Sequence, residues 1–191
     1  LEGVVAAVRR HVPDVLVIDD GSAARGRAVA ESLLTRGLAE VIFRSENGGK
    51  GAAVMTGLAA AEARGYTHAV QIDADGQHDP EDLPRFLAAS TAKPNALILG
   101  RPVFDESAPK SRMLGRRISI FWCAVETMSR RVGDPLCGFR VYPVKATLAE
   151  KAVGRAMDFD PEIAVRLAWA GVPIEHVDTR VRYFGAREGG V

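Results

Sequence analysis

The sequence predicts an α/β protein with a mostly parallel central sheet flanked by helices. Short runs of β-branched and other apolar residues recur along the first hundred residues, and segments with helical periodicity separate them. These runs are apolar at successive positions, as in strands that are covered on both faces. Strands that alternate with helices favour parallel pairing through right-handed crossovers.

The elements of the first half alternate between helix and strand. Pro13 ends an opening amphipathic helix, Ser22 is a candidate cap for the second helix, and Gly37 is a candidate stop for it. Asp79 followed by Pro80 predicts a further helix start. The predicted strands are 15–18, 41–43, 68–72 and 96–99. The predicted helices are 1–12, 22–37, 51–64 and one that begins at 79.

The pattern changes after Gly100. We predict an irregular loop over 101–110 and then a long helix over 111–131, whose apolar residues recur on one stripe. A helix over 160–170 and a β-rich segment over 174–184 close the chain.

Composition limits the function classes. The 191 residues are 47% hydrophobic and 26% charged, which fits one globular domain. Lys and Arg number 25 and Asp and Glu 24, so we expect no nucleic-acid partner, which would need many uncompensated phosphate contacts. Cys123 and Cys137 lack zinc-site spacing and cannot form a disulfide framework, so a reducing compartment is expected. No apolar run approaches the ~18 residues of a membrane span.

Three predicted strands end in unusual polar turns. These turns are 19–22, 44–51 and 73–79. Because ligands of open α/β sheets bind beyond the carboxyl ends of the strands, we expect these turns to converge on one functional edge.

Asp73 and Asp75 give the most specific indication of a ligand site in these turns. Two carboxylates at a strand end can reach one hard divalent cation, and Gln77 offers a further oxygen. A strand that ends in a solvated acidic turn is the simpler reading of the two acids alone. The neighbouring polar strand ends favour a site for Mg²⁺ or Mn²⁺.

The other two turns have competing interpretations. Asp19 and Asp20 are either helix-capping groups or hydrogen-bond acceptors for a nucleobase N–H or a ribose hydroxyl of a bound nucleotide. The segment 47–51 is either a phosphate cradle, with charge from Lys50, or a βα turn in which Gly51 packs closely at the helix start. It lacks the full Walker pattern.

Two single residues near these turns are further candidates for the functional edge. Arg101 lies on the same predicted edge and is either a surface arginine or a group that neutralises a diphosphate. His78 is expected to be a solvated loop histidine rather than a ligand.

The motifs together resemble family 2 glycosyltransferases. They are VIDDGS (17–22), NGGKGAA (47–53), QIDADGQHDPEDLP (71–84), CGFRVY (137–142) and MDFDPEIAVRLAWAG (157–171). Their order resembles most the dolichyl-phosphate-mannose synthase-like branch. The resemblance implies a single GT-A domain over 1–191, a Rossmann-like fold with a nucleotide-sugar-binding half (1–100) and an acceptor half (101–191).

The resemblance also implies that the sequence is part of a longer protein. The family's first strand, with a Pro-rich turn that contacts the nucleotide, is expected before Leu1. The C-terminal part of the family is expected to continue beyond the chain, and 185–191 are expected to start a mobile basic loop.

The resemblance assigns roles to individual residues. Asp19 and Asp20 match nucleoside-contacting acids, and Asp73 and Asp75 match the metal-binding DxD motif with Gln77 beside it. The expected nucleotide-sugar contacts are completed by Arg44, Lys50, Ala74 and Arg101, of which Arg101 would face the phosphates. Asp160 and Glu162 match the acidic acceptor-side segment.

The implied reaction is inverting sugar transfer from a UDP- or GDP-linked sugar, assisted by Mg²⁺ or Mn²⁺. A hydroxyl acceptor needs a general base, for which Asp160 and Glu162 are the candidates. A lipid-phosphate acceptor is already ionised and needs none, in which case both acids orient the acceptor or pair with Arg140. The alternatives are a sugar-phosphate nucleotidyltransferase and a non-catalytic nucleotide-sugar-binding module.

The acceptor is expected to be a lipid, a lipid phosphate or a cell-envelope glycan. The helix over 111–131 is then either an ordinary core helix or an interfacial helix on an anionic leaflet, with basic residues at both ends of its stripe. The second reading predicts a cytoplasmic protein that associates peripherally with the cytoplasmic face of the inner membrane.

Overall fold

The computed structural model describes residues 1–104 and 110–182. The helices are α1 (Glu2–Val8), α2 (Ala24–Thr35), α3 (Lys50–Ala63), the short 3-10 helix η1 (Pro80–Asp82), α4 (Leu83–Ala92), α5 (Lys110–Glu126), α6 (Val144–Ala149) and α7 (Phe159–Trp169). The strands are β1 (Leu16–Asp19), β2 (Glu40–Phe43), β3 (His68–Gln71), β4 (Leu97–Phe104), β5 (Arg140–Pro143) and β6 (Ile174–Val181). The expected basic loop over 185–191 lies outside the described residues.

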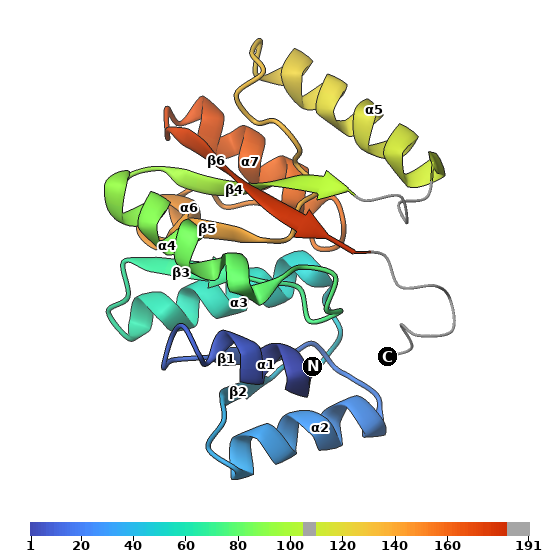
Figure 1. Ribbon diagram of the computed structural model, residues 1–191, viewed down its shortest axis with the longest axis vertical. Coiled ribbons are helices and arrows are strands. Elements are labelled where there is room, and N and C mark those ends of the chain that lie inside the picture. Colours follow the sequence, from blue (N-terminus) through green and yellow to red (C-terminus); the bar gives the residue numbers. More distant parts are fainter. Residues whose placement is uncertain (105–109, 183–191) are drawn as a thin grey trace.

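The sheet topology confirms the predicted α/β class. β1 and β2 pair in parallel, and a four-stranded sheet has the order β3-β5-β4-β6. In that sheet β3, β4 and β6 share one direction, while β5 runs antiparallel to β3 and β4. Figure 1 shows these four strands across the middle of the molecule, with α5 at one end of the long axis and α2 at the other. β5 and α6 were not predicted: residues 137–142 stood out only as the motif CGFRVY, and residues 144–149 carried no predicted element.

Two further expectations differ from the structure. Residues 101–104 were expected to be irregular, but β4 continues to Phe104 because Arg101–Phe104 pair in parallel with residues 178–181 of β6. The remaining residues of the predicted loop up to 109 lie outside the described part of the chain. Ser22 does not cap the second helix, which begins at Ala24 without a side-chain cap.

Alternating residues of β4 feed hydrophobic clusters on both faces of the sheet. Leu97 and Leu99 pack with residues of α3 and α7, whereas Ile98 packs with residues of α4 and β5. In the second cluster the rings of Phe86 and Phe139 stack with centroids 4.0 Å apart. Residues from both predicted halves therefore share one core. Within the described residues, no helix combines the length and the apolar character of a membrane span.

Candidate active site

Asp20 and Arg44 fix the glycine-rich loop between β2 and α3. Asp20 accepts hydrogen bonds from the backbone amides of Gly48 (3.0 Å) and Gly49 (2.7 Å), and from Arg44 Nε at 2.6 Å. Arg44 also donates to the carbonyl of Ala52 at 3.2 Å. Two amides that a phosphate cradle would offer are therefore used by Asp20.

Asp19 has an unpaired polar atom at the end of β1. Its side chain is 5% exposed, and its Oδ2 has no hydrogen-bond partner among the described residues. Buried polar atoms in native proteins nearly always have a partner. A ligand N–H or hydroxyl would supply one here.

Lys50 joins the end of β3 to the start of α7. Its Nζ lies 3.0 Å from Asp73 Oδ2 and 2.6 Å from Asp160 Oδ2. Burial lowers the pKa of Lys50, but the two carboxylates outweigh it and the pKa is raised. Burial raises the pKa of Asp73, but Lys50 outweighs it and holds the pKa below its usual value. Both groups are therefore charged at neutral pH.

Six side chains form a closed ring of polar contacts, which we call the polar ring. Its members in order are Lys50, Asp160, Arg140, Tyr142, Gln71 and Asp73. Tyr142 donates to Gln71 Oε1 at 2.9 Å, and Arg140 Nη2 lies 3.5 Å from Asp160 Oδ1. Arg140 is fully buried and also donates to the backbone carbonyls of Cys137 and Asp160. The expected pairing with Arg140 is thus present for Asp160.

Glycines allow the backbone to close around the polar ring. A Cβ on Gly138 would collide with the Asp73 carboxylate. A Cβ on Gly51 would lie 2.5 Å from the Gly154 carbonyl oxygen and 2.6 Å from Phe159 Cβ. The Gly51 amide donates to the Arg155 carbonyl at 2.7 Å. Gly51 therefore packs closely at the helix start, which is the turn reading of this loop.

This close packing predicts opposite effects of two alanines in α3. Gly51→Ala should lower the free energy of unfolding by about 1–3 kcal/mol, because backbone and a buried ring must move to make room. Gly57→Ala meets only Ile18, at 3.4 Å, and should raise the free energy of unfolding by about 0.5–1 kcal/mol through helix propensity. Urea denaturation of both variants measures the difference, and equal stability would contradict the described packing.

The oxygen donors after β3 suit a hard cation. Asp75 is exposed, and its Oδ1 accepts a hydrogen bond from the backbone N–H of Gln77 at 2.9 Å. Asp73 lies two residues before it, and Ala74 separates the two acids. Carboxylate and amide oxygens are what Mg²⁺ and Mn²⁺ prefer. Within residues 1–104 and 110–182, no group of three or more His, Cys, Asp or Glu side chains is gathered as a metal site. Asp73, Asp75 and Gln77 are therefore of the chemical type that could hold such a cation.

His78 is buried, which corrects the expectation of a solvated histidine. Its side chain is 7% exposed and packs edge-on against Phe139, with ring centroids 5.7 Å apart. Burial lowers the pKa of His78, although Asp73 and Asp75 act in the opposite direction. The backbone of His78 forms an antiparallel bridge with Val181 at the end of the edge strand β6, which holds this part of the turn beside β6.

Two expected site residues lie apart from the polar ring. Arg101 pairs with Asp178 on the neighbouring strand β6 and is largely exposed. Glu162 accepts hydrogen bonds from the amides of Val153 (3.1 Å) and Gly154 (2.6 Å) and from Arg166 Nε at 2.6 Å. Burial raises the pKa of Glu162, but these donors outweigh it and the pKa is lowered. Glu162 thus anchors the loop before α7.

Sequence reasoning missed Gln71 and Tyr142 as parts of the site. Both lie in strands, β3 and β5, whose register places Gln71 opposite Arg140. The available signal was a polar residue next to apolar ones in a short strand-like segment. Arg140, the first residue of RVYP, is an example. A buried guanidinium at that position requires buried hydrogen-bond or ion-pair partners, and residues such as these supply them.

Comparison with known proteins decides the family. The sequence model described as glycosyl transferase family 2 matches residues 1–148. The chain belongs to this family. Its expected GT-A fold is shared by glucosyl-3-phosphoglycerate synthase from Mycobacterium tuberculosis, whose crystal structure holds Mn²⁺ and UDP-glucose. That structure superposes with a TM-score of 0.70 and 19% identity, over 98% of this chain and 68% of that one.

Two curated relatives of this family 2 glycosyltransferase match part of it. A polyprenol monophosphomannose synthase from Mycolicibacterium smegmatis is 38% identical over 104 residues, which are 52% of this chain and 39% of the relative. An undecaprenyl-phosphate mannosyltransferase from Micrococcus luteus is 39% identical over 90 residues, which are 43% of this chain and 35% of the relative. The matches thus span less than two fifths of each relative.

Proposed function

We propose that this family 2 glycosyltransferase moves a sugar, with inversion, from a nucleoside-diphosphate sugar to a lipid-linked phosphate. The observation that carries the proposal is the Lys50–Asp73 pair at the carboxyl end of β3, beside the exposed Asp75. A cationic side chain and two carboxylates next to each other suit a diphosphate and the divalent cation that accompanies it. In this proposal 1–100 form the donor half and 101–191 the acceptor half.

The donor would be held by residues at the ends of β1 and β2, by Lys50 at the start of α3 and by Arg101 within β4. The unpaired Asp19 Oδ2 would accept from the base or the ribose. Asp20 and Arg44 would act by fixing the loop that presents Lys50. Arg101 would exchange Asp178 for the diphosphate, which costs little because exposed ion pairs contribute little to stability.

Asp73, Asp75 and Gln77 would hold Mg²⁺ or Mn²⁺. The cation would supply positive charge to the leaving diphosphate. Lys50 would add its own charge there, since its ammonium already lies beside Asp73.

The acceptor class is proposed from the names of the two relatives, both of which refer to polyprenyl-type carriers. A phosphate nucleophile is already ionised, so no side chain has to remove a proton. Asp160 would then hold Lys50 and Arg140 in place, and Glu162 would fix the acceptor-side loop.

Nucleotide binding tests the donor assignment. Thermal unfolding of the chain should shift upward with UDP or GDP, and the shift should grow when Mn²⁺ is present. The nucleotide that gives the larger shift identifies the donor base. No shift with either nucleotide, with or without Mn²⁺, would contradict the proposed donor site.

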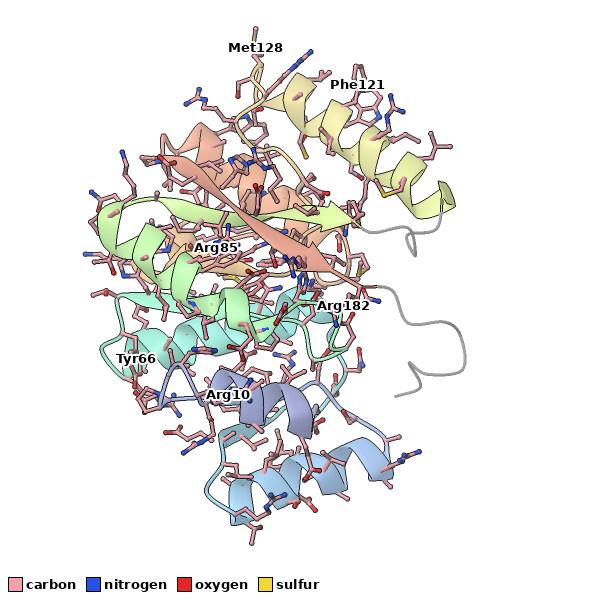
Figure 2. All side chains as sticks on the ribbon, viewed as in Figure 1. Arg10, Tyr66, Arg85, Phe121, Met128 and Arg182 are labelled. Carbon is pink, nitrogen blue, oxygen red and sulfur yellow. The ribbon has the colours of Figure 1, made fainter. Side chains whose placement is uncertain are left out.

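An exposed apolar face on α5 supports membrane contact. Met113 and Ile120 are half-buried, but five large apolar residues on its other side are each at least 49% exposed, so this stripe is not core: Leu114, Ile118, Phe121, Trp122 and Val125. Met128, just beyond α5, is 93% exposed, and Figure 2 shows Phe121 and Met128 pointing outward at one end of the molecule. Arg117, Arg130 and Arg131 are exposed nearby. This combination suits the interface of an anionic leaflet, and it supports the proposal that the protein associates peripherally with the cytoplasmic face of a membrane.

Removing the apolar anchors should release the protein from vesicles. The double variant Phe121→Glu/Trp122→Glu should reduce co-sedimentation with anionic liposomes by about tenfold, because two interfacial rings are lost and two negative charges are added. Leu34→Glu is the control, since Leu34 is 46% exposed on α2 at the opposite end of the molecule. Equal recovery of all three proteins with the vesicles, or of the wild type in the supernatant at low salt, would contradict the membrane assignment.

A further inference from the structure

Lys50 contacts the carboxylate of Asp73, one of the two acids that a divalent cation on this turn would use. Its Nζ contacts Asp73 Oδ2 at 3.0 Å, on the turn that also carries Asp75. The other oxygen of Asp73 faces Gln71 Nε2 at 3.4 Å. Both oxygens of Asp73 are therefore already approached by donors of the protein.

An ammonium and a divalent cation compete for the same carboxylate oxygen. A metal ligand must offer its lone pair at about 2.0–2.2 Å, and a positive group in contact with that oxygen repels the incoming ion. The cation can take Asp73 only when the Lys50 ammonium moves away. Such movement is available to lysine because its charge sits on a flexible four-carbon stem.

The surroundings of Lys50 give the ammonium a second anchor. Asp160 is 1% exposed, its backbone carbonyl accepts from Arg140 at 3.0 Å, and its Oδ1 lies 3.5 Å from Arg140 Nη2, so it stays beside Lys50 as a second anion. The backbone of Lys50 is also fixed, because Gly49 has a φ of 84° and Gly51 packs against the loop before α7. The side chain alone can therefore exchange Asp73 for another anion.

We infer that Lys50 is an internal cation that keeps Asp73 from binding a divalent metal until a diphosphate arrives. The diphosphate offers the ammonium a new partner, and the carboxylate then becomes free for the metal. Metal and nucleotide bind cooperatively through this exchange, so each raises the affinity of the protein for the other. The inference rests on the proposed function, because it takes the donor to be a diphosphate.

Mn²⁺ binding without nucleotide tests the inference, with free Mn²⁺ followed by electron paramagnetic resonance on the full chain. Lys50→Met should bind Mn²⁺ about tenfold or more tightly than the wild type, the size of effect expected for removing one charge-assisted hydrogen bond. Lys50→Arg, which keeps the charge, and Lys93→Met, an exposed lysine at the end of α4, should bind as the wild type does. Adding Asp75→Asn to Lys50→Met should remove the tight site.

A second readout covers the case in which Lys50→Met folds poorly. Lys50→Gln keeps hydrogen-bonding capacity without charge, and Mn²⁺ alone should raise its melting temperature more than that of the wild type. Measurable but equal Mn²⁺ affinity in the wild type and both neutral variants would overturn the inference and leave the metal site standing. Absence of Mn²⁺ binding in every protein, including the neutral variants, would overturn the inference and the proposed metal site together.

Discussion

Asp75→Ala is expected to lower sugar transfer by about 10³-fold or more while the fold persists. The expected size follows from the several kcal/mol that a metal ion contributes to a charged transition state, at 1.36 kcal/mol per factor of ten. The fold should persist because Asp75 is exposed and accepts a hydrogen bond from the backbone amide of Gln77 in the same turn. The loss should appear in turnover rather than in stability.

The control for this change is Asp79→Ala in the same turn. Asp79 Oδ1 accepts from the Glu81 amide at 3.1 Å and caps η1, so its loss should cost about 1 kcal/mol of stability and leave turnover within a few-fold. Transfer is measured with saturating nucleotide sugar and Mn²⁺, and unfolding by circular dichroism. Unchanged turnover in Asp75→Ala would remove these acids from the reaction.

Asp160→Asn is expected to cost about 3–5 kcal/mol of folding free energy, the penalty for removing one partner of a buried ion pair. Arg140 is fully buried and would lose the Asp160 charge, and Lys50 would keep only Asp73. Glu162→Gln is the comparison in the same helix. Its partners include two loop amides and Arg166, whose side chain is 33% exposed, so this change should cost less, about 1–3 kcal/mol, through one acceptor lost to the Gln NH₂ group.

The same variant separates the two acceptor classes. With a lipid-phosphate acceptor, the folded Asp160→Asn protein should lose less turnover than the ~10²–10⁴-fold expected for a missing general base. Stopped assays below the melting temperature, corrected for the folded fraction, measure this. A loss in that range, with a flattened pH–rate profile, would identify Asp160 as a base and contradict the phosphate acceptor.

The sequence predicts most of the fold because its strands are continuous apolar runs. Strands near 16–19, 40–43, 68–71 and 97–99 come from this signal and from the helices between them. It fails where pairing is decided by distant partners. β5 begins with a buried arginine rather than an apolar residue, and this arginine is satisfied by the carbonyls of nearby Pro135 and Cys137 and by that of the distant Asp160. Residues 101–104 form strand because they pair with β6, and no local sequence pattern predicts that pairing.

The sequence predicts which turns come together at the site, but not which side chains pair there. Lys50 and Asp73 stand on different predicted strand ends, and they do lie together. The partners within each turn are not predictable, because they depend on side-chain direction. Asp20 turns toward the loop amides, Glu162 toward the loop before α7, and Arg101 toward Asp178. His78 becomes buried because the end of β6 reaches its backbone.

The most direct test of the proposed transfer is the product released from a nucleotide sugar. The chain is incubated with Mn²⁺, UDP- or GDP-linked sugars and a polyprenyl phosphate, with the Asp75→Ala protein in parallel. We predict that the wild type releases a nucleoside diphosphate in step with formation of a glycosylated lipid, and that the Asp75→Ala protein releases almost none. In a second incubation that supplies a nucleoside triphosphate and a sugar phosphate instead, release of pyrophosphate would indicate a nucleotidyltransferase. Nucleotide-sugar binding without release of either product would indicate a binding module, and either result would contradict the proposed sugar transfer.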